Sequence, residues 1–294
     1  MNKKVMLSGM AILASSMLVL GGCGASDDKA KEEKPKTTET KTETKTETKT
    51  ETKTVKKTDE KQLLDWSYSG KTGPENWGSI KPAYKISDTG KAQSPINIKT
   101  SDTTQDAKLK IDYKYQPTMF KVTRKDQSVQ AVAETTKGRA DSKMTLGGKD
   151  YILKEINIHT PSEHELDGKK FDAELQLKHV STDKKTTIVS IFVKSGKENL
   201  AIGDLPSLIN DSKNGSTTDM KKIVSTLGLI PQDSAFYVYD GSLTTPATTE
   251  GVKWVVYEKP ITMSKQQLQD LSSQLKGNNR PVQEQNNRVV SSNQ

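Results

Sequence analysis

Cysteine is almost missing from this chain of 294 residues, in which Cys23 is the single thiol. One thiol excludes a framework of disulfides within the chain. The sequence also lacks the glycine-rich loops that bind nucleotide phosphates and the short motifs that surround a catalytic serine or cysteine. An apolar run over residues 5–20 is too short, and wrongly flanked, for a stable membrane span. The sequence therefore does not indicate a disulfide-stabilised scaffold, a nucleotide-binding protein, a serine or cysteine hydrolase, or a membrane-spanning protein.

Positive charge is present but mild in the part of the chain that is expected to fold. The formal net charge is +8, of which two charges belong to residues 1–22 and one to residues 24–61, leaving +5 for residues 62–294. Such a small surplus does not indicate a nucleic-acid-binding surface. We therefore expect no nucleic-acid partner.

Residues 1–22 have the organisation of a secretory signal peptide. Lys3 and Lys4 precede the apolar run, and small residues follow it up to Cys23. The stretch LGGC resembles the bacterial lipobox. This resemblance implies a lipid on Cys23 at the mature N-terminus and a protein anchored to the extracellular face of the cell membrane, in a Gram-positive-type bacterium. The alternative is an uncleaved anchor in which Cys23 is incidental.

Residues 23–60 are expected to be a disordered linker that begins at the lipidated cysteine. Four copies of TETK run from Thr38 to Lys53. Their glutamates are four residues apart, so a helix would stack like charges on one face, and a strand would have no apolar face to bury. The segment therefore predicts a solvated spacer that holds the next domain away from the membrane.

Residues 61–290 predict one mostly β domain, followed by a tail at 291–294. Short segments with alternating apolar and polar residues, separated by turn residues, are typical of a large antiparallel sheet. These segments are 108–113, 128–134, 143–148, 150–159, 173–180, 186–194 and 252–259. A helix is indicated where Ser264 and Gln267 form a capping box, three leucines mark one face and Gly277 ends the pattern.

A row of polar residues on one of these segments indicates a site. Strand side chains alternate between the two faces of a sheet. Glu155, Asn157 and His159 therefore share one face, while Ile156 and Ile158 share the other.

Several segments, in the same order along the chain, resemble the α-carbonic anhydrases. They are WSYSGKTGPENWG (66–78), QSPINI (93–98), HTPSEHELDG (159–168), AELQLKH (173–179), YDGSLTTP (239–246), EGVKW (250–254) and NNRPVQ (278–283). The resemblance covers nearly the whole domain. It implies a large, twisted, mainly antiparallel sheet of about ten strands, a few peripheral helices and a conical pocket that runs to the centre.

The resemblance also implies a zinc site, and the chain departs from its ligand pattern. Active members hold a catalytic zinc with three histidines and leave a fourth position for water. The three corresponding positions here are Asn157, His159 and Gln176. Amide oxygens are weak ligands where the metal prefers imidazole nitrogen. We therefore expect no cofactor, and any metal that does bind would bind through His159.

Other positions match residues that surround the metal in the family. Thr244 matches the threonine that orients zinc-bound hydroxide, and Glu163 matches the glutamate that accepts its hydrogen bond, so we interpret them as a vestigial pair. Glu174 matches the carboxylate that orients the third histidine. The simpler interpretation of all three is maintenance of the fold by buried hydrogen bonds. Further residues expected at the pocket are Glu155, Lys178, Gln127, Leu243 and Thr245.

Four more matches concern the interior of the domain. His164 and His179 match histidines that are hydrogen-bonded behind the site, so we expect both in the core. Ser87 and Thr248 stand where many secreted relatives form a disulfide, which agrees with the single cysteine.

The two polar rows also predict a contact between charges. If Asn157 pairs with Gln176 across antiparallel strands, the register brings Glu155 opposite Lys178. A lone buried charge is costly, and facing opposite charges make both tolerable. We predict an ion pair, with both amides bonded around it, in place of a metal centre. The alternative is that Lys178 extends its amine to the pocket mouth and contacts nothing.

Three functions stay open at this point. The first is a non-catalytic, carbonic-anhydrase-like lipoprotein that binds a glycan, a protein or a small anion. The second is a working carbonic anhydrase that converts carbon dioxide and water to bicarbonate, with zinc held by His159 and another residue such as Glu155. The third is an envelope protein whose pocket is vestigial.

Overall fold

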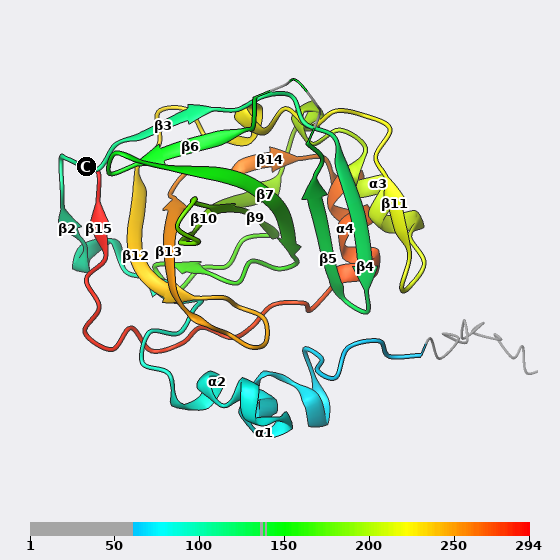
Figure 1. Ribbon diagram of the computed structural model, residues 1–294, viewed down its shortest axis with the longest axis horizontal. Coiled ribbons are helices and arrows are strands. Elements are labelled where there is room, and N and C mark those ends of the chain that lie inside the picture. The colour runs from blue at the N-terminus through cyan, green and yellow to red at the C-terminus, as the bar shows by residue number, and fades with distance from the viewer. Residues whose placement is uncertain (1–60, 136–137, 139) are drawn as a thin grey trace, which may run out of the picture. The chain divides into compact units, whose positions relative to one another are not determined.

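A single large sheet organises the described part of the chain. The computed structural model describes residues 61–135, 138 and 140–294 (Figure 1). Within these residues thirteen strands form the large sheet, and β1 and β8 form a separate parallel pair. The strands are β1 Asn97–Ile98, β2 Thr104–Gln105, β3 Ile111–Lys114, β4 Phe120–Lys125, β5 Ser128–Ala133, β6 Lys143–Leu146, β7 Lys149–His159, β8 Glu165–Leu166, β9 Ala173–Val180, β10 Thr186–Ser195, β11 Thr217–Asp219, β12 Phe236–Ser242, β13 Glu250–Tyr257, β14 Ile261–Met263 and β15 Ser291–Ser292.

The order of strands places the two polar rows side by side near the centre of the sheet. The order is β11-β4-β5-β7-β9-β10-β13-β12-β15-β2, with β14 beside β10 and the β3–β6 hairpin beside β7. Most pairs are antiparallel, and β10–β13, β10–β14 and β15–β2 are parallel. The expected mainly antiparallel β fold is therefore confirmed. Edge strands of two or three residues raise the number of strands above the expected ten.

The helices are short and lie outside the sheet (Figure 1). They are η1 Gly70–Thr72, η2 Pro74–Asn76, α1 Trp77–Ile80, η3 Pro82–Tyr84, α2 Ile86–Thr89, η4 Thr100–Asp102, η5 Leu200–Ile202, α3 Leu205–Asp211, η6 Thr226–Leu229 and α4 Lys265–Leu275. The predicted capping box of α4 is present, with Ser264 and Gln267 bonded reciprocally. Gly277 follows the helix with φ +84°, a conformation that favours glycine.

β9 separates the main apolar core from a polar side of the sheet. Leu175 and Leu177 are fully buried in the core that Leu271 and Leu275 of α4 also join. Glu174, Gln176 and Lys178 alternate with them and therefore point to the opposite face. The predicted period of two holds along this strand.

β7 needs an irregularity to achieve the same separation. Its register with β9 shifts between Leu153 and Glu155, and Lys154 is exposed there. Because of this bulge, Leu153 and Ile156 both join the main core although one is odd-numbered and the other even. The bulge re-aims Glu155 and Asn157 to the polar face. Simple alternation over the whole of residues 150–159 does not describe this strand.

Two smaller apolar clusters complete the interior. Phe192 and Trp254 are fully buried in a cluster on the other side of β10 and β13. Near the start of the domain, Trp66, Tyr68 and Trp77 pack edge to face with centroid distances of 5.2–6.1 Å. The second cluster places Tyr68 beside the polar face of the sheet.

A hydrogen bond joins the positions at which the resemblance implies a disulfide in relatives. Thr248 Oγ1 donates to Ser87 Oγ at 3.1 Å, and both residues are buried. The contact shows that these two positions lie side by side, although they are 161 residues apart in the sequence.

The last residues belong to the sheet, contrary to the tail expected at 291–294. β15 pairs with β12 and with β2. Val290 is buried, and its carbonyl accepts from the Thr104 backbone N–H at 2.9 Å. The stretch SSNQ has no apolar alternation, so its pairing through backbone groups left no pattern in the sequence.

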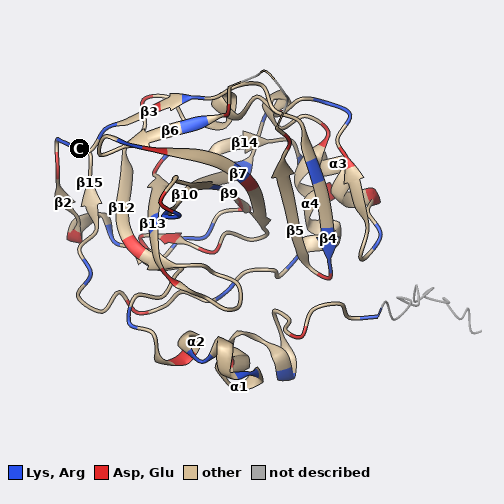
Figure 2. Cartoon of the chain, in the orientation of Figure 1, with Lys and Arg blue, Asp and Glu red and all other residues tan. Residues whose placement is uncertain are grey.

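The predicted signal peptide (1–22), Cys23 and the linker to residue 60 lie outside the described residues. No helix among the described residues is long and apolar enough to cross a membrane. Figure 2 shows Lys and Arg interspersed with Asp and Glu over the strands and loops of the domain. This distribution agrees with the mild surplus of positive charge.

Candidate ligand-binding pocket

A cavity of about 200 Å³ lies on the polar side of β7 and β9. The two strands supply its floor, and the segment after β12 supplies another part of its wall. Eight of the residues singled out in the sequence line it: Glu155, Asn157, His159, Gln176, Lys178, Leu243, Thr244 and Thr245. The structure therefore brings most of the predicted pocket together.

The pairing of β7 with β9 has the predicted register. Asn157 lies opposite Gln176, and Glu155 lies opposite Lys178. Lys178 Nζ is 3.1 Å from Glu155 Oε1, and the two side chains are 25% and 14% exposed. Asn157 Nδ2 donates to the same glutamate oxygen at 3.2 Å. The ion pair is therefore formed, and Lys178 does not extend free to the pocket mouth.

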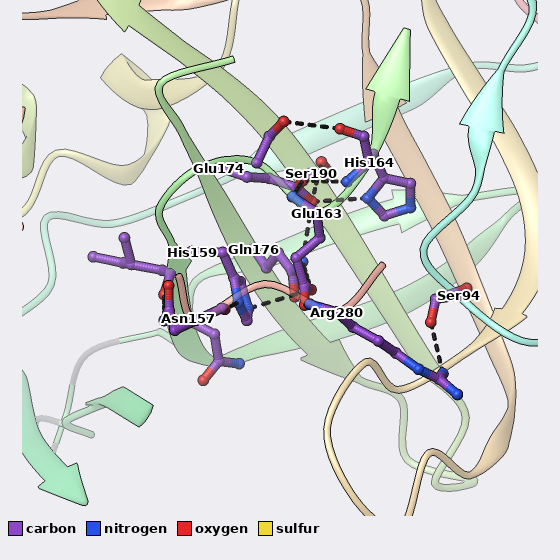
Figure 3. Close-up of polar contacts among 12 residues, drawn as sticks. Ser94, Asn157, His159, Glu163, His164, Glu174, Gln176, Ser190 and Arg280 are labelled. Atoms are coloured by element: carbon purple, nitrogen blue, oxygen red, sulfur yellow. Dashed lines mark hydrogen bonds and ion pairs between the residues drawn. The ribbon is translucent and has the colours of Figure 1, made fainter. Parts of the chain in front are cut away.

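Gln176 is not bonded to this ion pair, contrary to the prediction. Its Nε2 donates to Glu163 Oε2 at 2.8 Å and to Glu174 Oε1 at 3.0 Å (Figure 3). Both glutamates are fully buried, and a carboxylate can only accept hydrogen bonds. Because both carboxylates are buried away from bulk solvent, they hold the amide nitrogen more strongly than the partly exposed ion pair does.

Glu174 is held by five hydrogen bonds. Besides Gln176, its Oε1 accepts from His164 Nδ1 at 2.9 Å and Ser190 Oγ at 2.8 Å. Its Oε2 accepts from the backbone N–H groups of Glu163 and His164. Burial alone raises the pKa of Glu174, but the charge and the hydrogen bond of His164 lower it to about 2. Glu174 is therefore a carboxylate over the whole ordinary pH range.

Glu163 does not bond to Thr244 as the resemblance implied. Its Oε1 accepts from the Arg280 backbone N–H at 2.9 Å, and its Oε2 lies 3.4 Å from His159 Nε2. The amide of Gln176 also occupies Oε2. Among the described residues the Thr244 hydroxyl has no hydrogen-bond partner, so the predicted hydroxyl–carboxylate pair is not formed.

Asn278 fixes His159 in the wall of the cavity. His159 Nδ1 is 2.6 Å from the Asn278 carbonyl oxygen, which can only accept, so Nδ1 carries a proton. The Asn278 side chain bonds the backbone N–H of Thr160 and the carbonyl of Ile158, both at 2.8 Å. Asn278 was not singled out in the sequence. It lies 119 residues from His159, and only its place in the family-like stretch NNRPVQ offered a signal.

Tyr68 also lines the cavity and was also missed. Its hydroxyl makes no hydrogen bond to any described residue. Burial, followed by the negative charge of Glu163, raises the pKa of Tyr68 well above its ordinary value, so the hydroxyl keeps its proton. No spacing connects it to β7; only the stretch WSYSGK within the family resemblance included it.

Gln127, predicted at the pocket, does not line it. Its Nε2 donates to the Lys276 carbonyl at 2.8 Å, and the residue faces a neighbouring cavity of about 110 Å³ that Tyr68 and Ser128 share. The reason is its position in the turn between β4 and β5, before the strand reaches the main cavity.

The two other histidines lie in the core, as expected. His164 Nε2 is 2.6 Å from Tyr239 Oη, at the back of the Glu174 network. His179 stacks on Tyr115 and bonds its hydroxyl at 2.7 Å. Burial lowers the pKa of His179 to about 3, so this side chain stays neutral. Neither histidine lines the cavity.

Residues 72–294 match the family model of the eukaryotic-type carbonic anhydrases. The chain belongs to this family. It is 34% identical over 229 residues to a carbonic anhydrase of Klebsiella pneumoniae, covering 76% of this chain and 89% of that protein. The α-carbonic anhydrase of Thermovibrio ammonificans, solved with the inhibitor sulfanilamide, superposes with a TM-score of 0.70 at 32% identity, covering 77% and 98% of the chains. Dioscorin complexed with ascorbate gives the same score and identity, covering 77% and 97%.

Zinc is the metal that membership of the carbonic anhydrase family implies, and the residues of this cavity do not fit it. His159 supplies the only imidazole in the cavity wall. The amide nitrogens of Asn157 and Gln176 donate hydrogen bonds to carboxylates. Neither side chain therefore offers a metal ion a nitrogen ligand in the way that an imidazole would. In the described part of the chain no group of three or more His, Cys, Asp and Glu side chains is arranged to hold a metal ion. A catalytic zinc requires three such ligands.

Proposed function

We propose that this member of the carbonic anhydrase family is a binding protein of the bacterial envelope, without zinc-dependent hydration of carbon dioxide. The amide of Gln176 carries the proposal. It donates to Glu163 and Glu174 at once, at 2.8 and 3.0 Å, in a place where the resemblance implies a histidine bound to metal. A zinc ligand at this position would have to break both bonds and leave two buried carboxylates short of donors, which is costly.

The second wall of the cavity supports the same proposal. A metal held by His159 and Glu155 would require Glu155 to leave Lys178, which lies 3.1 Å away, and to release Asn157. An unpaired lysine would then remain beside the metal ion and repel it. The scaffold of the family is present, while the carboxylates at its polar centre are satisfied by bonds within the protein.

The relatives indicate what a member of this fold can bind. One solved dioscorin is a complex with ascorbate, a small organic molecule. By analogy, the cavity here serves to bind a small ligand or the end of a larger one, among which a glycan, a protein segment and a small anion are the candidates. We place the protein on the extracellular face of a membrane, with a lipid on Cys23 as its anchor and no nucleic-acid partner.

Hydration of carbon dioxide by the full chain, with and without added zinc, tests the proposal. We expect the wild-type protein to give no acceleration above the buffer. The matched control is the double variant Asn157→His and Gln176→His, in which His159 would gain two imidazole neighbours. Because Glu163, Glu174 and Thr244 are retained, this variant should bind zinc. Hydratase activity of the wild-type chain that a chelator abolishes would contradict the proposal.

A further inference from the structure

The cavity presents hydrogen-bonding groups that no described residue uses. The hydroxyls of Tyr68, Ser128 and Thr244 line it, and none of them bonds to another described residue. Gln176 and Asn157 turn their amide nitrogens toward carboxylates, which leaves each carbonyl oxygen as an unused acceptor. The wall of the cavity therefore offers a ligand both hydrogen-bond donors and hydrogen-bond acceptors.

Electrical charge in the wall is balanced. Lys178 is neutralised by Glu155 at 3.1 Å. Directly behind the wall, Glu163 and Glu174 are fully buried, and both bond to the side chain of Gln176. Glu155 and Lys178 are paired with each other, and donors of the protein already hold the two buried carboxylates, so neither a free anion nor a free cation finds an unpaired charge in the wall. A charged ligand would also lose more hydration than a neutral one on entering.

We propose that the cavity binds a neutral polyhydroxylated ligand, such as one hexopyranose ring at the end of a glycan. This inference rests on the proposed function and names the class of ligand that the site takes. Sugar hydroxyls both donate and accept, so they match the mixture of unused groups. The apolar side chains of Leu243 and Ile188 suit the C–H faces of the ring, since Ile188 lies opposite Lys178 on the cavity face of the sheet.

Charge selectivity can be tested with sugars that have the same hexopyranose ring but differ in charge. The full chain is titrated by calorimetry with four neutral hexopyranoses (glucose, galactose, mannose and N-acetylglucosamine) and with glucuronate and glucosamine. We expect at least one neutral sugar to bind, at least tenfold more tightly than the anionic or cationic sugar. Tighter binding of glucuronate than of every neutral sugar would overturn the inference. So would the failure of all four neutral sugars to bind at millimolar concentration.

Variants locate the binding in this cavity. Tyr68→Phe and Thr244→Val each remove one hydroxyl with little change in volume, and each should weaken binding about threefold to tenfold. Tyr151→Phe is the matched control because Tyr151 lies in the main core, outside the cavity, and it should leave the affinity unchanged. If neither cavity variant alters the affinity while both unfold like wild type, the sugar binds elsewhere and the inference is wrong.

Breaking the ion pair should invert the selectivity. Glu155→Gln leaves Lys178 unpaired and should shift the preference to glucuronate, while Lys178→Met should shift it to glucosamine. Unchanged selectivity in both would contradict the role given to the pair. Absence of sugar binding in a zinc-free, inactive protein overturns this inference alone, whereas stoichiometric zinc with hydratase activity overturns the proposed function itself.

Discussion

At the scale of single residues, the amide of Gln176 is the one side-chain donor in the described part of the chain that Glu163 and Glu174 share. Both glutamates are fully buried, so the loss of this donor leaves charged acceptors incompletely satisfied. Hydrogen bonds to charged groups contribute about 1.5–3 kcal/mol each. The amide therefore stabilises the centre of the fold more than an amide at the cavity surface does.

We expect Gln176→Leu to lower the free energy of unfolding by about 3 kcal/mol, because two bonds to buried carboxylates disappear. Asn157→Leu is the matched control, since Asn157 donates once, to a glutamate that is partly exposed, and it should cost about 1 kcal/mol or less. Urea unfolding of both variants measures the difference. Equal losses in the two variants would show that the buried carboxylates do not depend on Gln176.

His179 makes stability depend on pH. Burial lowers its pKa to about 3 in the folded chain, against an ordinary value of 6.5. Between these values the unfolded chain binds a proton that the folded chain does not, so stability rises with pH and is lost as pH falls below 6.5. Glu174, with its pKa lowered from 4.5 to about 2, adds a loss of the same sign only below pH 4.5.

Between pH 6 and pH 5, the effect of His179 on the free energy of unfolding can therefore be measured without that of Glu174. The free energy of unfolding of wild type should fall by about 1 kcal/mol per pH unit more than that of His179→Phe. Denaturant unfolding at several pH values gives both slopes. Parallel slopes in the two proteins would mean that His179 is not buried in its neutral form.

At the scale of elements, the pairing of β7 with β9 could be predicted because both strands carry polar residues at alternate positions. That pattern gave the shared face, and one assumed pair, Asn157 with Gln176, then fixed Glu155 opposite Lys178. The partner of Gln176 could not be predicted in this way. It depends on Glu163, which lies in a loop that no strand register places.

Other elements have weaker patterns of apolar and polar residues in the sequence, so they are harder to predict. β12 has apolar residues on both faces, since Phe236 joins the main core and Tyr237 the smaller one, so it shows no alternation. β4 places Arg124 at an inward position after Phe120 and Val122, which interrupts the apolar row. Tyr68 and Asn278 reach the cavity from distant loops, where only tertiary packing places them.

The β7–β9 register also predicts an energetic coupling. A double-mutant cycle of Glu155→Gln and Lys178→Met should give about 1 kcal/mol of coupling in the free energy of unfolding, because the two side chains are largely shielded from water. The free energies are measured by urea unfolding at low salt. Strict additivity of the single substitutions would indicate that the contact contributes nothing.

At the scale of the whole molecule, we propose that the segment before residue 61 determines where the domain acts. The sequence predicts a signal peptide, a lipid on Cys23 and a charged spacer ahead of the domain. Cys23→Ala removes the only thiol, and we expect it to move the protein from the membrane fraction to the medium. Immunoblots of both fractions measure this. Retention of the variant in the membrane would favour an uncleaved anchor.

We propose that bonds within the protein have replaced the metal centre of the carbonic anhydrase family. Zinc content, measured by mass spectrometry on wild-type protein that was equilibrated with zinc and then dialysed, tests it most directly. The double variant Asn157→His and Gln176→His, treated identically, serves as the positive control. We predict far less than one zinc per wild-type chain and close to one per double-variant chain. A ratio near one for the wild type would contradict the account.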